Sequence, residues 1–167
     1  MAFEIEFLEL LYYTLVAYFT NGSCTLAELV KKRHPLDFNK NLGKNRILGD
    51  GKTFEGVAIG LSVGALSSYI ISLLVPTFIF TAGFMVSSFT VIGDIVSSFV
   101  KRRLGKPRGS LWFPVDQYDF IVSSYIILSF YIKINFWAML IFLVLTYFIH
   151  RGANLLAYRL KLKKVPW

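Results

Sequence analysis

Three aspartates are the residues of this sequence best suited to chemistry. Asp94 stands alone in an apolar run, and Asp116 and Asp119 follow it after a short basic stretch. Acidic side chains in hydrocarbon are costly and usually mark a functional site. Asp116 and Asp119 are spaced i, i+3 and therefore share one face of a helix. The basic stretch is short enough to return Asp116 to the side of Asp94, so we expect the carboxylates to converge.

Cations and a hydroxyl accompany these acids. In a helix, positions i, i+4, i+7 and i+8 share one face. This face presents Asp94, Ser98, Lys101 and Arg102. Convergent carboxylates rimmed by Lys and Arg form a site for a divalent metal and phosphate oxygens, since Mg²⁺ favours carboxylates together with substrate phosphates. Two structural alternatives stay open: an ion pair of Asp94 with Lys101 or Arg102, and acids that merely suit a helix N-terminus.

A glycine-rich turn before the second apolar block supplies another polar cluster. Gly51, Lys52 and Thr53 match the end of a phosphate-binding P-loop, but Arg46 stands where that motif requires glycine, and no strand precedes it. The P-loop interpretation therefore fails. The backbone amides of the turn and the cations of Arg46 and Lys52 can still bind phosphate. The alternative is a basic loop that faces anionic lipid.

The elements that must position these residues belong to a membrane protein. Of the 167 residues, 55% are hydrophobic and only 17% are charged, against about 25% charged residues in soluble domains. The apolar residues gather in blocks, which excludes a soluble enzyme. We expect one all-α membrane-embedded domain over residues 1–167 with five transmembrane helices. The spans are expected at about 7–30, 55–75, 77–102, 115–132 and 134–153, with polar loops at about 31–54 and 103–114.

The distribution of basic residues orients this arrangement. All of the 18 Lys and Arg residues except Lys133 fall on one side of the five spans. Because basic loops stay in the cytoplasm, we expect the N-terminus outside and both long loops and the C-terminus inside. The polar site then lies at the cytoplasmic face of the cell membrane. The aromatic residues suit interfacial belts better than a base-stacking platform, so no nucleic-acid partner is expected.

A stripe of small residues marks one helix face. Gly56, Gly60 and Gly64 recur every four residues within the second apolar block. Small residues at this spacing let membrane helices approach closely. We expect them to pack within the bundle, with a homodimer through the same face as the alternative.

The residues around the acids resemble a known signature. The C-terminal signature of the CDP-diglyceride synthase superfamily is similar to the pattern Gly93-Asp94-x3-Ser98-x2-Lys101-Arg102-x2-Gly105-x3-Gly109-x4-Pro114-x-Asp116-Gln117-x-Asp119. The short loop looks like the archaeal branch, the CDP-archaeol synthases, and segments 35–38 and 46–53 are similar to that branch's other motif. The five-span layout and the size agree, so the resemblance covers essentially the whole chain. Relative to bacterial members, the loop is shorter and Arg108 stands where those enzymes carry an acid.

This resemblance implies a CTP-dependent cytidylyltransferase. It would transfer CMP from CTP to digeranylgeranylglyceryl phosphate, an unsaturated archaeal ether-lipid phosphate, and yield CDP-archaeol and pyrophosphate, with Mg²⁺ as the cofactor. Under this interpretation Asp94 and Asp116 are metal ligands, and Asp119 is a third ligand or an orienting group. The residues that would bind nucleotide and phosphates are Arg46, Lys52, Thr53, Ser98, Lys101, Arg102 and Arg108.

Two other functions stay open at this point. A phosphatidate cytidylyltransferase would run the same reaction on an ester lipid. A small ion-coupled membrane transporter would use Asp94 as its coupling-ion site, but it predicts a pair of interrupted helices in related halves, and the sequence shows no internal repeat. Transport also leaves unexplained why the acids gather beside cations.

Overall fold

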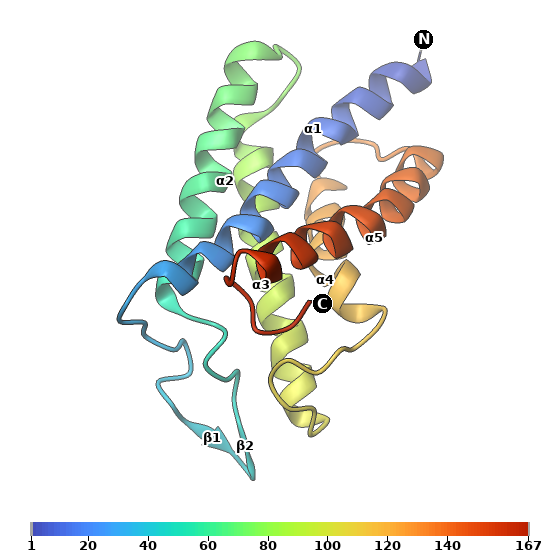
Figure 1. Ribbon diagram of the computed structural model, residues 1–167. Coiled ribbons are helices and arrows are strands. Elements are labelled where there is room, and N and C mark those ends of the chain that lie inside the picture. Colours follow the sequence, from blue (N-terminus) through green and yellow to red (C-terminus); the bar gives the residue numbers. More distant parts are fainter. Residues whose placement is uncertain (1, 167) are drawn as a thin grey trace.

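The computed structural model describes residues 2–166 and is built almost entirely of helices (Figure 1). The α-helices are α1 (Ala2–Ser23), α2 (Phe54–Leu74), α3 (Phe80–Arg103), α4 (Val115–Leu128) and α5 (Phe136–Arg159). The other elements are a 3-10 helix, η1 (Cys24–Leu29), and an antiparallel hairpin in the first loop, β1 (Asn41–Leu42) and β2 (Asn45–Arg46). Each predicted span therefore corresponds to one α-helix, with shifted ends.

Local sequence explains where two of the helices begin. Thr53 caps α2 because its side-chain oxygen accepts a hydrogen bond from an amide of the first turn at 3.1 Å. Asn135 caps α5 in the same way, by accepting from two amides at 3.0 and 3.1 Å. Pro76 lies in the turn between α2 and α3, where a missing amide proton breaks no helical hydrogen bond. The gap expected between the spans that end at 75 and begin at 77 coincides with this turn, whereas the gap expected at 133 falls within a longer connection, 129–135.

The helices differ in whether their length and apolar composition suit a membrane span. Among the residues described, α2, α3 and α5 are long and apolar enough to cross one by length and composition. The 14 residues of α4 extend about 21 Å at 1.5 Å per residue, against about 30 Å for the hydrocarbon core. The helix expected over 115–132 ends earlier, at Leu128, where the chain turns although the sequence stays largely apolar. The predicted span 7–30 divides into α1, which begins earlier, and η1.

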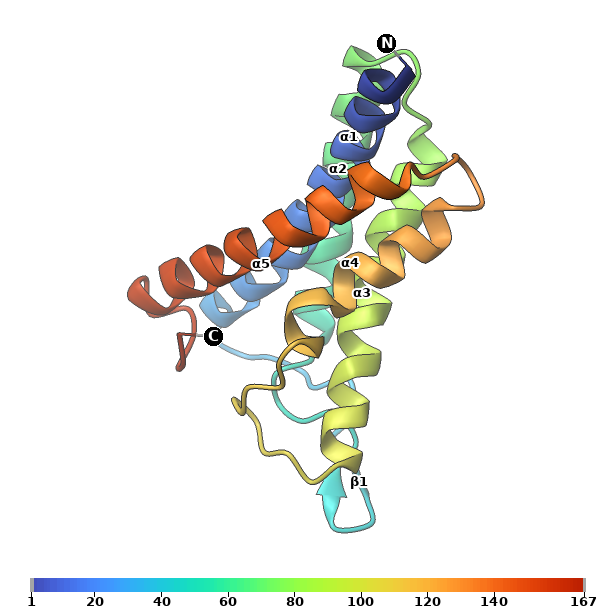
Figure 2. The same ribbon diagram turned by 90° about the vertical axis from the view of Figure 1, so that its right-hand side faces the viewer.

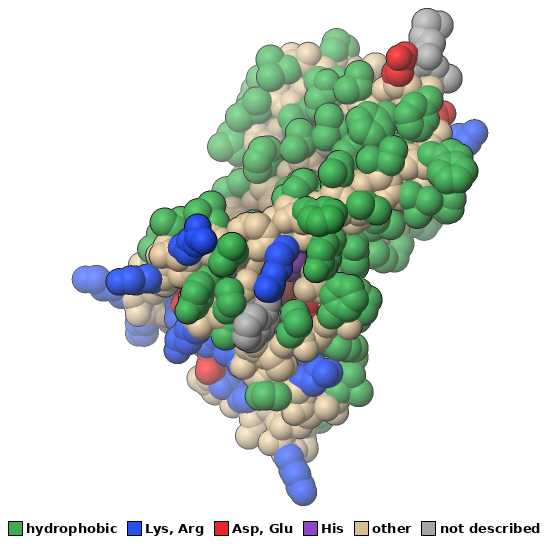
Figure 3. Space-filling model, turned by 45° about the vertical axis from the view of Figure 1, so that its right-hand side comes forward, with side chains coloured by type: hydrophobic (Ala, Val, Ile, Leu, Met, Phe, Trp, Pro, Cys, Tyr) green, Lys and Arg blue, Asp and Glu red, His purple; other side chains and the backbone are tan. Residues whose placement is uncertain are grey.

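The buried core lies between α1, α3, α4 and α5. Tyr13 stacks on Phe78 with ring centroids 4.4 Å apart, and Phe120 of the same buried cluster lies 6.1 Å from Tyr18 between ring centroids. Hydroxyls also bond across these interfaces, for example Thr90 with Ser124 at 2.7 Å. Such contacts join helices where no water competes. Hydrophobic side chains cover much of the outer surface, whereas most of the visible Lys and Arg gather at one end (Figure 3).

The glycine stripe of α2 packs inside the molecule. Gly56, Gly60 and Gly64 are buried, and atoms of α1, α3 and η1 lie against them. A methyl group at Gly60 would come within 2.5 Å of the Cys24 sulfur, so glycine permits this close approach. The predicted packing within the bundle is confirmed. A homodimer through these glycines would require α1 and α3 to leave this face.

Candidate active site

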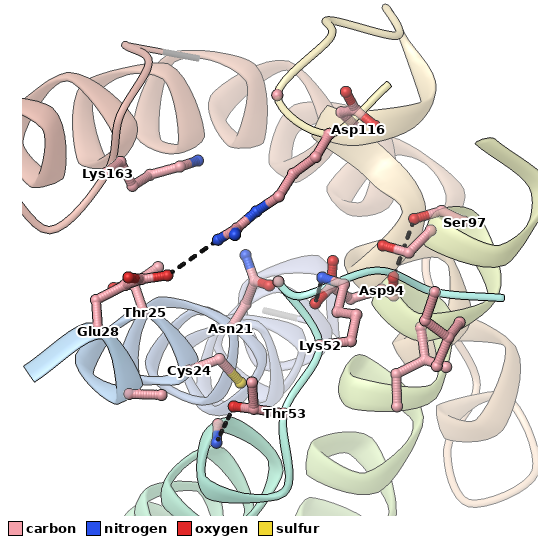
Figure 4. A pocket seen from close by; sticks show the side chains of 18 of the residues that line it. Asn21, Cys24, Thr25, Glu28, Lys52, Thr53, Asp94, Ser97, Asp116 and Lys163 are labelled. Carbon is pink, nitrogen blue, oxygen red and sulfur yellow. Dashed lines mark hydrogen bonds and ion pairs between the residues drawn. The ribbon is translucent and has the colours of Figure 1, made fainter. Parts of the chain in front are cut away.

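A cavity of about 490 Å³ lies where both long loops meet the bundle. Its walls come from α1, η1, the start of α2, the C-terminal half of α3, the first turns of α4, both loops, and α5 with the chain that follows it (Figure 4). The predicted site residues that line it are Lys52, Thr53, Asp94, Ser98, Lys101, Arg102, Arg108, Asp116 and Asp119. Of the predicted set, only Arg46 lies elsewhere. The three aspartates therefore share one cavity.

The first loop carries Lys52 into the cavity from a position just before α2. The ammonium of Lys52 donates a hydrogen bond to Oδ2 of Asp94, which comes from α3 (Figure 4). Burial alone would lower the pKa of Lys52, but the adjacent Asp94 raises it, so the lysine stays protonated. The Leu36 amide holds this stretch of loop by donating to the Lys52 carbonyl at 2.8 Å. The alternative pairing of Asp94 with Lys101 or Arg102 does not occur.

Lys101, a buried cation of α3, pairs instead with the start of α4. Its Nζ donates to both carboxylate oxygens of Asp116, at 2.9 and 2.8 Å, and to the Ser110 carbonyl at 2.8 Å. Asp116 also accepts a hydrogen bond from the Trp112 amide at 2.8 Å. These contacts close the loop between the two helices and return α4 to the side of α3.

Asp119 lies one turn further along α4. Its Oδ2 accepts a hydrogen bond from the hydroxyl of Ser97, a residue that the sequence motif does not include. Ser98, which belongs to the motif, lines the cavity at the next position. Gly93 permits the close approach of α3 and α4, since a methyl group there would lie 2.5 Å from the Asp119 carbonyl oxygen. This approach brings the carboxylate of Asp119 to the same cavity as Asp94.

The three aspartates are the candidate metal ligands. Mg²⁺ prefers carboxylate oxygens together with phosphate oxygens and water, and all three side chains line one cavity. In the part of the chain that the structure describes, however, no three Asp, Glu, His or Cys side chains are grouped closely enough to hold a metal ion. Lys52 and Lys101 pair with Asp94 and Asp116 instead. The donor set fits Mg²⁺ in its chemistry, and a metal ion would have to displace lysines from it.

Arg46 orders the first loop and does not line the cavity. Its guanidinium donates two hydrogen bonds to Asp37, at 3.1 and 2.6 Å, and a third to Asp50 at 2.8 Å. The buried Asp37 also accepts from the amides of Leu48 and Gly49 at 3.0 and 2.9 Å. Burial alone would raise the pKa of Asp37, but these hydrogen bonds hold that pKa well below its usual range. Asp37 is therefore an anion at the centre of the loop at neutral pH.

Two further arginines connect the loops to the rest of the site. Arg108 reaches the carboxylate of Glu28 in η1 at 3.2 Å, and this ion pair spans the cavity (Figure 4). Arg103, at the end of α3, donates to three carbonyls of the first loop, those of Leu42, Asn45 and Arg46. Arg108 thus joins the second loop to η1 across the cavity, and Arg103 joins α3 to the first loop.

Part of the cavity wall has no motif in the sequence. Asn21 comes from the end of α1, Cys24 from the start of η1, Asn154 from α5 and Lys163 from the chain after α5. The sequence predicts the lysines after α5 only as part of the cytoplasmic edge. Nothing in the local pattern signals the place of Lys163, because that place depends on how the chain turns after α5.

Related sequences cover nearly the whole chain. Residues 3–167 match the CarS-like family model, described as CDP-archaeol synthase. The CDP-archaeol synthase of Pyrobaculum calidifontis is 46% identical over 151 residues, which cover 90% of this chain and 92% of that protein. A CDP-archaeol synthase of Saccharolobus islandicus is 40% identical over 155 residues, which cover 92% of each chain.

A solved structure shares the fold. It is described as an intramembrane enzyme for archaeal membrane lipid biosynthesis, and it matches with a TM-score of 0.79 and 27% sequence identity over 88% of this chain and 93% of that one. The family model spans nearly the whole chain, and the two relatives are similar over most of their length. This chain therefore belongs to the CDP-archaeol synthase family.

Proposed function

We propose that this chain is a CTP-dependent cytidylyltransferase that forms CDP-archaeol. It transfers CMP from CTP to digeranylgeranylglyceryl phosphate and releases pyrophosphate. The observation that carries this proposal is the cavity, in which three carboxylates meet cations from separate segments at the basic end of an apolar bundle. A water-soluble nucleotide and a lipid headgroup can both reach such a place. Membership of the CDP-archaeol synthase family supports the same reaction.

The reaction needs charge neutralisation more than covalent chemistry from the protein. An oxygen of the lipid phosphate attacks the α-phosphorus of CTP, and the bond from that phosphorus to the bridging oxygen breaks as pyrophosphate leaves. Such transfers are promoted mainly by positioning and charge stabilisation. Lys52, Arg102 and Arg108 would bind the phosphates. Ser98 and Thr53 would donate hydrogen bonds, and the hydroxyl proton of Thr53 is available because the helix cap uses its oxygen as an acceptor.

Asp94, Asp116 and Asp119 would hold Mg²⁺ in this proposal. When bound, the ion supplies positive charge to the phosphate oxygens and favours departure of pyrophosphate. Lys52, once released from Asp94, would have its ammonium free for a phosphate in the same cavity. Lys101 would gain the same freedom on release from Asp116. The two ion pairs thus keep both lysines where phosphates would arrive.

We further propose that the cavity faces the cytoplasm and that all five helices cross the membrane. Most visible Lys and Arg gather at the end of the molecule away from the apolar surface (Figure 3), as expected for cytoplasmic segments. In this orientation the N-terminus lies outside. The largely apolar connection 129–135 would complete the crossing that α4 begins, because the helix alone is too short.

Pyrophosphate release by the purified protein in detergent tests this function. The assay contains CTP, Mg²⁺ and digeranylgeranylglyceryl phosphate, and each component is omitted in turn. We expect release to require all three and to fall at least about 100-fold in Asp94→Asn, since loss of one charge-stabilising group typically has this effect. Asp50→Asn, which alters an exposed acid of the first loop, should stay near wild type.

Two outcomes would change the proposal. Release with phosphatidic acid in place of the ether lipid would reassign the lipid substrate and keep the cavity chemistry. A folded protein that neither binds CTP nor releases pyrophosphate would overturn the function.

A further inference from the structure

The chain after α5 turns back sharply. Lys161 has a φ of 61°, in the left-handed region. The amide of Leu162 donates to the Ala157 carbonyl at 2.8 Å, and the amide of Lys161 donates to the Tyr158 carbonyl at 3.0 Å. These two bonds form a Schellman motif, which ends a helix and reverses the chain. The chain therefore leaves α5 in a direction that brings residues 162–166 back beside the bundle (Figures 1 and 2).

Side-chain contacts hold the returned segment against the cavity. Nζ of Lys163 donates a hydrogen bond to Oδ1 of Asn154, a buried residue of α5, at 2.8 Å. The methyl groups of Val165 lie next to Gly109 in the loop between α3 and α4. Residues 161–165 line the cavity, and the ammonium of Lys163 points toward it (Figure 4). The segment is thus a wall of the site.

Lys163 is a cation within the electric field of the site. Burial lowers the pKa of Lys163 to about 8, the charge of Lys52 lowers it too, and Asp94 and Asp116 oppose this change. The side chain therefore stays mostly protonated at neutral pH. Within residues 2–166, no carboxylate forms an ion pair with it, whereas Lys52 and Lys101 are each paired with an aspartate. A largely buried cation with a neutral amide as its partner is stabilised by an arriving anion.

We propose that Lys163 binds a phosphoryl group of a substrate, so that the returned C-terminal segment completes the phosphate-binding site. This inference rests on the proposed function, which brings two sources of phosphate into the cavity, the triphosphate of CTP and the headgroup of the lipid. Asn154 orients the lysine before substrate arrives. Lys163 then adds a cation from a third segment, the chain after α5, to the cations of the two long loops and α3.

Three variants test the proposal through separate KM values for CTP and for digeranylgeranylglyceryl phosphate. Lys163→Met keeps the length of the side chain and removes its charge, and we expect one of the two KM values to rise about 10- to 100-fold, as for loss of a hydrogen bond to a charged group. Lys163→Arg should recover most of this loss. Arg159→Gln is the matched control, because it removes a charge from the exposed end of α5 outside the cavity wall, and both KM values should stay near wild type.

The KM value that rises identifies the phosphate that Lys163 binds. Unchanged KM values in Lys163→Met would overturn the proposal, and so would equal losses in Lys163→Met and Lys163→Arg, which indicate a structural role. Calorimetric titration of CTP and of the lipid phosphate provides the same comparison without turnover. A wild-type protein without pyrophosphate release would contradict the proposed function, whereas an active wild type with unaffected Lys163→Met contradicts only the role of Lys163.

Discussion

Replacing Asp37 by asparagine tests whether one buried carboxylate holds the first loop in place. Asp37 accepts two hydrogen bonds from Arg46 and one each from the amides of Asn39, Leu48 and Gly49. Its Oδ1 accepts two of these bonds and its Oδ2 accepts three. Asparagine keeps one acceptor and turns the other into a donor. In either orientation of the amide, at least two N–H groups would therefore face an NH₂ group.

The size of the effect follows from these two lost bonds. A hydrogen bond to a charged group contributes about 1.5–3 kcal/mol. We take the lower end for each bond, because Arg46 is partly exposed and the freed donors can turn to water, which gives about 3 kcal/mol in total. At about 1.4 kcal/mol per tenfold change, this loss raises the population of the open loop roughly 150-fold.

Hydrogen exchange at the amides of Leu48 and Gly49 measures this opening in detergent. We expect exchange roughly 100-fold faster in Asp37→Asn, together with reduced cytidylyl transfer, because Lys52 belongs to the same loop. Asp50→Asn is the matched control: its side chain is 61% exposed, and an exposed ion pair contributes about 0–1 kcal/mol. Exchange in Asp37→Asn within about threefold of wild type would refute the role assigned to this carboxylate.

Three further changes have clear directions. Gly64→Ala pushes a methyl group into Ser87 and should destabilise the protein by about 1–3 kcal/mol, which would lower its melting temperature. Gly22→Ala, which has open space around it, should leave the melting temperature unchanged. Arg103→Gln removes donors to three carbonyls of the first loop and should speed proteolysis of that loop about tenfold; an unchanged cleavage rate would contradict this. The pKa of Asp37 is depressed, so the first loop should keep its protection from hydrogen exchange between pH 7 and about pH 5 and lose it progressively in stronger acid. Loss of protection above about pH 6 would show that another group titrates.

The helices could be predicted from the sequence because their signals are local. Blocks of apolar residues and the gaps between them located five elements, and the structure has a helix in each place. The end of α4 could not be predicted, since the sequence stays largely apolar beyond Leu128 while the chain turns. The choice between bundle packing and dimerisation at Gly60 likewise needed the position of α1, which no periodicity encodes.

The sequence predicts which residues line the candidate site better than it predicts which of them contact one another. A short loop was enough to bring Asp116 to the cavity of Asp94, but Lys52 reaches Asp94 across 42 positions of sequence, and no pattern links residues at that separation. The contact of Asp119 with Ser97, the neighbour of the motif residue Ser98, was not predicted, since a step of one residue rotates a helix by about 100°. Only the contact between α3 and α4 decides which of the two positions faces the carboxylate.

The two ion pairs of the cavity turn ligand binding into an exchange of partners. Lys52 and Asp94 neutralise each other, as do Lys101 and Asp116. A triphosphate alone would draw the lysines away and leave the carboxylates beside its own negative charge. A divalent cation alone would leave the lysines beside a second positive charge. Under the proposed function, a nucleotide that arrives together with Mg²⁺ would compensate both pairs at once, so the two ion pairs would favour binding of the metal–nucleotide complex over binding of either member alone.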